Sequence, residues 1–268
     1  MYSNKTSMNI QKKRKEIKAK LKSRGKIFSG WTSLGHPQIS EMIAMSGVDF
    51  VGIDIEHSTI NQEQAQRIIS VCHGQEVLCL PRVASHNAES IRRLLDSGAD
   101  GIIVPTVETK EQVQDLVDYI KYPPIGKRGF GIARAQGYGH NFDDYISSWN
   151  ENSSFIIQIE SIKAVKNIDS ILKADEIDGV MIGPYDISGS LGIPGQISHP
   201  DVVDACKIVI ESCLKYNLSC GTQDINPTYK SITEQFKLGF TFIVLSSDIF
   251  LFKKWGEEIG RMIKKIDE

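Results

Sequence analysis

Apolar positions along the chain form short continuous runs, and most runs are followed by a stretch of helical period. The runs predict eight strands, at 27–32, 49–55, 77–82, 101–106, 154–160, 179–183, 218–223 and 241–246. Helical spacing of apolar residues follows several of them, as at 87–97, 108–120 and 226–238. Strands that are apolar along their whole length are typical of a parallel sheet covered by helices. The alternation therefore predicts an α/β fold.

A weak internal repeat supports this architecture. Ser46-Gly-Val-Asp-Phe, Ser97-Gly-Ala-Asp-Gly and Leu238-Gly-Phe-Thr-Phe each lead into a strand, and Glu176-Ile-Asp-Gly does so without the first glycine. A glycine just before a strand is the expected C-cap of the preceding helix. The eight predicted strands in 268 residues match a single (β/α)₈ TIM barrel over residues 26–268. A doubly wound open sheet is the alternative, but no Gly-x-Gly-x-x-Gly follows the first strand.

The charge is distributed unevenly. Residues 12–26 carry nine Lys or Arg against one acid, Glu16, whereas the whole chain has a formal net charge of −2. A basic arm for nucleic acid is one interpretation. We favour a solvated basic helix within residues 1–25, because Ile10, Ile17 and Leu21 fall at helical spacing and Gly25 can cap the end. No aromatic residue is interleaved with the bases, so we expect no nucleic-acid partner.

Composition also bears on the compartment. No apolar run approaches the ~18 residues that a membrane span requires, and the polar start of the chain lacks the apolar stretch of a signal peptide. The five cysteines contain no Cys-x-x-Cys pair, which suits reduced thiols. We therefore expect a cytoplasmic protein with no membrane partner.

Chemistry in a TIM barrel takes place at the carboxyl ends of the strands. Glu160 and Asp186 end two successive predicted strands and would converge on one side of that end. Two carboxylates without a cysteine or nearby histidine form an oxygen-only site, which suits Mg²⁺ or Mn²⁺. For Asp186 the alternative is a helix N-cap, because it precedes a short predicted helix.

Two further strand ends carry candidate catalytic groups. Arg82 can donate to a developing oxyanion, or it can simply form a salt bridge to a strand-end acid. His57 follows Asp54 by three residues, and an aspartate beside an imidazole favours a general base; a histidine that merely ends the strand is the alternative. No predicted strand ends in lysine, which argues against a Schiff-base mechanism.

A glycine-rich stretch follows Pro123-Pro124. We expect residues 122–140 to form a mobile loop that covers the site, with Arg128 and Arg134 as substrate contacts.

Taken together, these stretches resemble the HpcH/HpaI family of class II, divalent-metal-dependent pyruvate aldolases. The resemblance covers nearly the whole chain and rests on Gly30-Trp31, Asp54-Ile-Glu-His57, Pro81-Arg82, Leu94-Leu-Asp96-Ser-Gly, Tyr122-Pro-Pro-x-Gly-x-Arg-Gly129, Gln158-Ile-Glu160, Ile182-Gly-Pro-Tyr-Asp-Ile-Ser188 and His199-Pro200. It implies an aldehyde-lyase that cleaves or forms 4-hydroxy-2-oxo acids from pyruvate and an aldehyde through a metal-stabilised enolate.

The resemblance also implies a role for each matching residue. Glu160 and Asp186 would be ligands of Mg²⁺, Mn²⁺ or Co²⁺, Arg82 would steady the enolate oxygen, and His57 with Asp54 would act as base through a metal-bound water. Trp31 would form a wall of the pocket, and backbone groups of Gly183 and Tyr185 would hold the pyruvate carboxylate. Asp96 would reach a neighbouring subunit's site in a hexameric homo-oligomer.

The sequence departs from the family pattern at Tyr185, where many members have a small residue, and at Ile55, where glycine is frequent. These changes bear on the aldehyde partner. Two alternatives stay open: related enolate chemistry on a citrate-like or acyl-CoA substrate, and a non-catalytic barrel that binds a small acid.

Overall fold

In the computed structural model, which describes residues 2–267, parallel strands close into a barrel in sequence order from β1 to β8. The strands are β1 (Ile27–Thr32), β2 (Phe50–Asp54), β3 (Leu78–Arg82), β4 (Gly101–Val104), β5 (Ser154–Ile159), β6 (Gly179–Ile182), β7 (Ser219–Asp224) and β8 (Phe242–Leu245). Each predicted strand lies within two residues of an observed one at either end. The prediction of a (β/α)₈ TIM barrel is confirmed.

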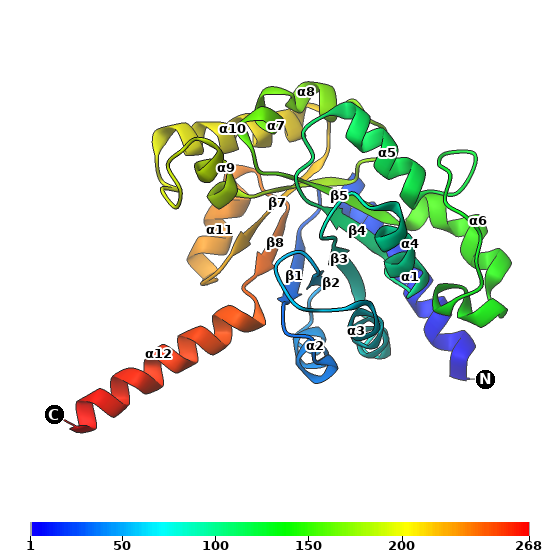
Figure 1. Ribbon diagram of the computed structural model, residues 1–268, viewed down its shortest axis with the longest axis horizontal. Helices are drawn as coiled ribbons and strands as arrows, with labels where there is room; N and C mark the ends of the chain where they lie inside the picture. Colours follow the sequence, from blue (N-terminus) through cyan, green and yellow to red (C-terminus); the bar gives the residue numbers. More distant parts are fainter. Residues whose placement is uncertain (1, 268) are drawn as a thin grey trace.

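Helices surround the barrel, and the last helix of the chain projects away from it (Figure 1). They are α1 (Tyr2–Lys22), α2 (Pro37–Ala44), α3 (Gln62–Gly74), α4 (Ala88–Asp96), α5 (Lys110–Ile120), α6 (Phe142–Asn152), α7 (Ile162–Lys166), α8 (Ile168–Ile171), α9 (Pro184–Ser190), α10 (Pro200–Lys215), α11 (Tyr229–Leu238) and α12 (Asp248–Asp267), with a short 3₁₀ segment, η1 (Arg134–Gly139).

Local sequence signals set several helix ends. Asn61 and Thr109 begin α3 and α5 through capping boxes, in which side chain and backbone exchange hydrogen bonds. The repeat glycines Gly47, Gly98 and Gly239 have φ values of 88°, 105° and 107°. Only glycine adopts these values without strain, which explains why the repeat places a glycine before these three strands.

Two apolar layers build the core. One lies between the sheet and the surrounding helices. The other fills the barrel interior and consists of Ile10, Ile17, Leu21, Ile27, Trp31, Phe50, Leu78, Leu80, Ile103, Ile156, Met181, Phe242 and Val244. Helix α1 supplies the first three of these residues, so it shares the core inside the barrel.

The expectation of a solvated basic helix is wrong for part of α1. Arg14 and Lys18 are only 6% exposed each. The bases of α1 pair with the aspartates of the internal repeat: Arg14 Nε lies 2.7 Å from Asp100 Oδ1, Lys18 Nζ 2.6 Å from Asp178 and Lys20 Nζ 2.6 Å from Asp49 Oδ1. Each aspartate also accepts the N–H of the residue that begins, or nearly begins, the neighbouring strand, from Cys79, Phe155 and Phe28 respectively. The repeat aspartates thus tie α1 to the amino ends of the strands.

Residues 122–140 do not cover the carboxyl end of the barrel. Arg128 is 2% exposed, lies 4.7 Å from the ring centroid of Tyr122 and donates to Asp96 Oδ1 at 2.7 Å. Arg134 donates to Ser97 O at 3.2 Å, directly before β4. Both side chains therefore lie on the amino side of the barrel, and within one chain they do not reach the carboxyl end where the substrate contacts were expected.

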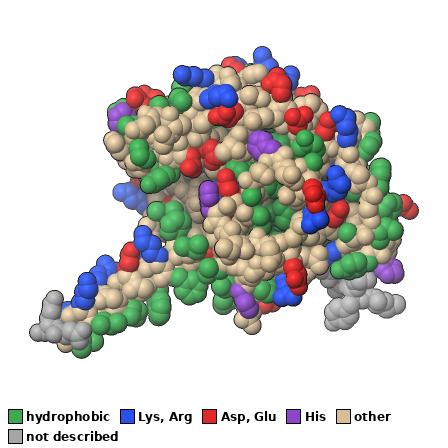
Figure 2. All heavy atoms as spheres, in the orientation of Figure 1, with side chains coloured by type: hydrophobic (Ala, Val, Ile, Leu, Met, Phe, Trp, Pro, Cys, Tyr) green, Lys and Arg blue, Asp and Glu red, His purple; other side chains and the backbone are tan. Residues whose placement is uncertain are grey.

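Helix α12 projects away from the barrel (Figure 1). Asp248, at its first turn, holds it to the end of β1 by accepting bonds from Thr32 Oγ1 and the N–H of Ser33. Beyond that anchor, apolar side chains gather along one side of the helix and basic ones along another (Figure 2). Within residues 2–267, no helix combines the length and apolar character needed to cross a membrane.

Candidate active site

Trp31 and Arg82 form one wall at the carboxyl end of the barrel. Trp31 closes β1 and is 3% exposed, and the guanidinium carbon of Arg82 lies 5.2 Å from its ring centroid. Gly52 is the β2 partner of Trp31 in the sheet register. A Cβ on Gly52 would lie 2.2 Å from a ring carbon of Trp31, so the glycine makes room for the indole. The guanidinium is thus stacked and held in place.

Arg82 is also held by two acids. Its Nη2 lies 2.9 Å from both carboxylate oxygens of Asp54, and its Nε lies 3.2 Å from Glu56 Oε2. The salt bridge to a strand-end acid, which was the alternative interpretation of Arg82, is therefore present in the structure. It does not exclude a catalytic role, because a guanidinium has five N–H donors and can bind a further oxygen.

The structure changes the expected pairing of Asp54 with His57. Asp54 Oδ1 accepts the backbone N–H of His57 at 3.1 Å, and its side chain is committed to Arg82. The imidazole instead faces Glu56, with Nε2 3.7 Å from Oε2, and the His57 side chain is 68% exposed. Since β2 ends at Asp54, the turn that follows it carries Glu56, not Asp54, to the ring.

Glu160 follows β5 and is 8% exposed. Its Oε1 accepts the N–H of Thr106 at 2.7 Å, and its Oε2 accepts a bond from Gln158. Burial raises the pKa of Glu160 to about 7; the Thr106 N–H opposes this, and the negative charges of Glu56 and Asp186 add to it. The carboxylate is therefore placed where a cation would stabilise its charged form.

Asp186 lies beside Glu160. A Cβ on Gly183 would contact both, at 3.0 Å from Glu160 Cβ and 3.3 Å from Asp186 Oδ2. The N-cap of α9 is Gly183, and no side-chain cap hydrogen bond is present there. Asp186 sits in the first turn, so the alternative that it serves as the N-cap is wrong. The structure thus brings the two predicted ligands together around one glycine.

The charges at this end of the barrel do not balance. Asp54 and Glu56 share Arg82, whereas Glu160 and Asp186 have no cation within ion-pair distance among the described residues. Among the side chains that the structure describes, no group of three or more His, Cys, Asp and Glu residues is arranged to hold a metal. Two adjacent carboxylates nonetheless match the one or two protein ligands that Mg²⁺ commonly takes. The residues therefore fit a hard divalent cation that keeps other positions for water and substrate.

Sequence reasoning gave no role to Glu56 or Gln158. Glu56 lies between His57 and Arg82, and burial raises its pKa against the opposing effect of Arg82 and His57. Gln158 lies two residues before Glu160, a spacing that puts successive strand side chains on the same face. That period was available as a signal for Gln158. The contacts of Glu56 depend on the turn after β2, and no pattern in the sequence predicts them.

The remaining predicted residues lie at different distances from this cluster. Tyr185 is 64% exposed, and its hydroxyl lies near Gly195. Asp96 ends α4 on the amino side of the barrel and binds Arg128 there, so within one chain it does not join the cluster.

A closed parallel barrel with acids and one arginine at its carboxyl end defines a TIM-barrel protein with an enzyme-like site. Residues 28–252 match the HpcH/HpaI aldolase/citrate lyase family. The chain belongs to that family.

Similar proteins span nearly the same length. The 5-keto-4-deoxy-D-glucarate aldolase of Escherichia coli O6:H1 (strain CFT073) is 28% identical over 250 residues, covering 93% of this chain and 97% of that protein. The crystal structure of an HpcH/HpaI aldolase from Desulfitobacterium hafniense DCB-2 has a TM-score of 0.84 at 27% identity, covering 92% of this chain and 96% of its own. The citrate synthase SbnG has a TM-score of 0.82 at 27% identity, covering 94% and 98%.

Proposed function

We propose that the protein is a divalent-metal-dependent aldolase that cleaves or forms 4-hydroxy-2-oxo acids from pyruvate and an aldehyde. The observation that carries the proposal is the Glu160–Asp186 pair, which has no basic partner among the described side chains and lies at the same barrel end as the stacked Arg82. The similarity to an aldolase along 93% of the chain supports the same class of reaction.

Glu160 and Asp186 would hold the metal, whether Mg²⁺, Mn²⁺ or Co²⁺. When bound, such an ion supplies Lewis-acid polarisation of a carbonyl oxygen. Arg82 would donate to the C2 oxygen as negative charge develops there during cleavage of the C3–C4 bond. Trp31 and Asp54 fix the guanidinium, so this donation requires no rearrangement.

His57 would remove the 4-hydroxyl proton through a water molecule. Its exposure leaves the ring accessible to solvent, and the Glu56 carboxylate 3.7 Å away would stabilise the imidazolium that forms. Backbone groups at Gly183 and Tyr185 would hold the pyruvate carboxylate. The exposed Tyr185 side chain would meet the aldehyde part of the substrate.

Proton exchange provides the test. With pyruvate and Mg²⁺ or Mn²⁺ in D₂O, we expect loss of the methyl proton signal, because enolate formation exchanges those protons. Glu160→Gln and Asp186→Asn should abolish both exchange and metal binding, while Asp204→Asn, a change at an exposed acid on α10, should retain them. Retained metal-dependent exchange in both site variants would refute the assignment. Pyruvate binding without exchange would indicate a non-catalytic barrel.

A second candidate is condensation on a citrate-like substrate, favoured by the similarity to the citrate synthase SbnG. The two functions differ in the partner of the enolate. Oxaloacetate or an acyl-CoA consumed in place of an aldehyde would support this second function and exclude the first.

We also propose that the protein acts as a homo-oligomer, with a hexamer as the expected state. Helix α12 leaves an apolar groove of about 560 Å³ between its own start, β1 and α2, lined by Met42, Ile43, Val48 and Phe252. Trp255, on the projecting helix, is 62% exposed. Exchange of α12 between two copies would cover both surfaces. The same proposal has Asp96 reach the active site of a neighbouring copy.

A further inference from the structure

A second cavity lies at the amino end of the barrel, opposite the proposed catalytic site. It has a volume of about 410 Å³ and is bordered by α1, the end of α3, Gly98, η1 and α6. All of these segments either precede a strand or pack beneath the barrel, so the cavity is separate from the strand carboxyl ends. Four basic side chains line it: Arg14, His73, Arg134 and His140.

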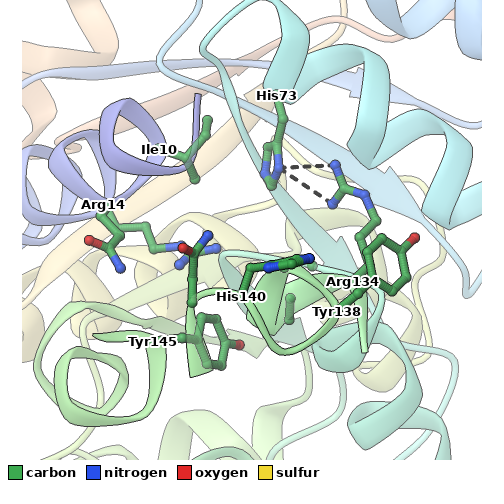
Figure 3. Close-up of a pocket in the computed structure, with 12 residues that line it drawn as sticks. Ile10, Arg14, His73, Arg134, Tyr138, His140 and Tyr145 are labelled. Atoms are coloured by element: carbon green, nitrogen blue, oxygen red, sulfur yellow. Dashed lines mark hydrogen bonds between the residues drawn. The ribbon is translucent and has the colours of Figure 1, made fainter. Parts of the chain in front are cut away.

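Figure 3 shows how these side chains lie. Arg14 enters from α1 and Arg134 from the opposite side, with His73 and His140 between them. The guanidinium of Arg134 lies 3.4 Å from His73 Nδ1, and the other ring nitrogen of His73 lies 2.8 Å from Asp100 Oδ2. His140 is exposed at the rim. The four groups therefore face one shared space.

The cavity carries excess positive charge. Among the described residues, Asp100 is the only carboxylate in hydrogen-bond or ion-pair contact with any of the four side chains. Its oxygens already accept from Arg14 Nε, His73 Nε2 and Cys79 N. Arg134 has no ion-pair partner among the described side chains, residues 8–266, and its direct contacts are Ser97 O and His73 Nδ1. One half-buried guanidinium is thus left without a counter-charge.

The environment of Arg134 also supplies too little negative charge to offset the burial of its guanidinium. Burial lowers its pKa from the ordinary arginine value, and Asp100 offsets this only in part. The loop that carries Arg134 is also held in an unusual conformation, because Gly137, Tyr138 and Gly139 all have positive φ values. Such strain in a non-glycine residue persists only where the surroundings enforce it, and it is typical of binding segments.

We propose that this cavity binds a small dianion, of the phosphate or dicarboxylate class, between Arg134, Arg14 and His140. The Nη groups of Arg14 have no hydrogen-bond partner among the described residues. The guanidinium carbon of Arg14 lies 5.4 Å from the ring centroid of Tyr145, and this stacking fixes the guanidinium in place. Two guanidinium groups supply paired N–H donors, which match the oxygens of phosphate and carboxylate. A volume of about 410 Å³ admits an anion with a short carbon skeleton.

Thermal unfolding with increasing phosphate or succinate, at constant ionic strength adjusted with NaCl, tests the proposal. We expect a saturable rise in Tm with at least one of the two anions, and the anion that binds identifies the class. Arg134→Gln should weaken the apparent affinity by about tenfold or more, because it removes a charge-assisted contact. The matched control Arg67→Gln removes an exposed arginine on α3 and should leave the affinity unchanged.

Two further variants keep the test decisive. His140→Glu places a carboxylate at the exposed rim without disturbing the core, and it should weaken binding even if Arg134→Gln folds poorly. Arg82→Lys alters the catalytic end only and should bind as the wild type does. No saturable effect of either anion would overturn the proposal. So would loss of binding in Arg82→Lys with retention in Arg134→Gln, since the anion would then occupy the catalytic end.

Discussion

Asp100→Asn would test whether the buried ion pairs between α1 and the repeat aspartates stabilise the fold. The Asp100 side chain has no exposed surface and accepts from three donors at 2.7–2.8 Å. Although burial raises the pKa of Asp100, His73 and Arg14 lower it from 3.8 to about 2. That shift corresponds to about 2 kcal/mol of stability that the ionised carboxylate supplies.

The variant should lose more than this amount. It leaves the Arg14 guanidinium, 7% exposed, without its counter-charge, and breaking one side of a buried pair typically costs about 3–5 kcal/mol. For a chain of this length the loss corresponds to a fall in Tm on the order of 10 °C. Glu63→Gln, which breaks an exposed pair with Arg67 on α3, should cost less than about 1 kcal/mol.

Calorimetry or denaturant unfolding would measure these losses, and pH adds a second readout. Because the folded-state pKa of Asp100 is lowered, its contribution is present above about pH 4 and is lost as the pH falls through about 2. Asp100→Asn should therefore flatten the acid limb of the stability curve. A loss no larger than that of Glu63→Gln would refute the reasoning. So would an additive effect of Arg14→Met in the double variant, since coupled partners must deviate from additivity.

Other changes test the site and the assembly. Arg82→Lys loses the paired donors and should lower turnover by roughly 10²–10³-fold with unchanged circular dichroism, and near-normal turnover would contradict its proposed role. Gly52→Ala places a Cβ 2.2 Å from the Trp31 ring and should cost about 1–3 kcal/mol with an altered tryptophan emission spectrum, whereas an unchanged spectrum would show that the ring has room. In the metal-free protein, stability should fall as the pH rises from about 4.5 to about 7, because the raised pKa of Glu160 makes the folded state bind the proton more tightly. Mg²⁺ should then raise Tm more at pH 8 than at pH 5, and Glu160→Gln should remove most of that difference. Trp255→Glu should shift the protein to smaller species in sedimentation velocity, and an unaltered oligomer would argue against exchange of α12.

The sequence predicted the elements closely because most strands are short, largely apolar runs bounded by polar residues, although β7 is mostly polar. It also placed Arg82 at the end of β3 and Glu160 directly after β5, since position along a strand determines which end of a parallel barrel a residue occupies, whereas Asp186 lies in the first turn of α9, after β6. Periodicity does not say which acid turns toward which base. For that reason the pairing of Asp54 with Arg82, in place of the His57 ring, appeared only in three dimensions.

Burial of charge was the other property that the sequence did not reveal. Nine bases on one segment are typical of a solvated surface, and nothing local distinguishes Arg14 and Lys18 from their neighbours. Their burial depends on aspartates roughly 90 and 160 residues away in the chain, which the fold brings under the barrel. The repeat contained that information, because its aspartate recurs directly before the strands. It becomes interpretable only when α1 is known to close that end.

Acidic side chains are neutralised by bases at the amino end of the barrel but only in part at the carboxyl end, and this contrast indicates where the chemistry takes place. At the amino end, each repeat aspartate meets a base from α1 and a backbone N–H, so the charges are neutralised within the chain. At the carboxyl end, Arg82 is shared by Asp54 and Glu56, while Glu160 and Asp186 have no base within ion-pair distance in the described part of the chain. A fold selected for stability alone gains nothing from a buried acid such as Glu160, whose pKa is raised by burial and by the negative charge of a neighbouring acid. Their retention beside a fixed guanidinium is explained if a divalent cation and an anionic substrate complete the charge balance.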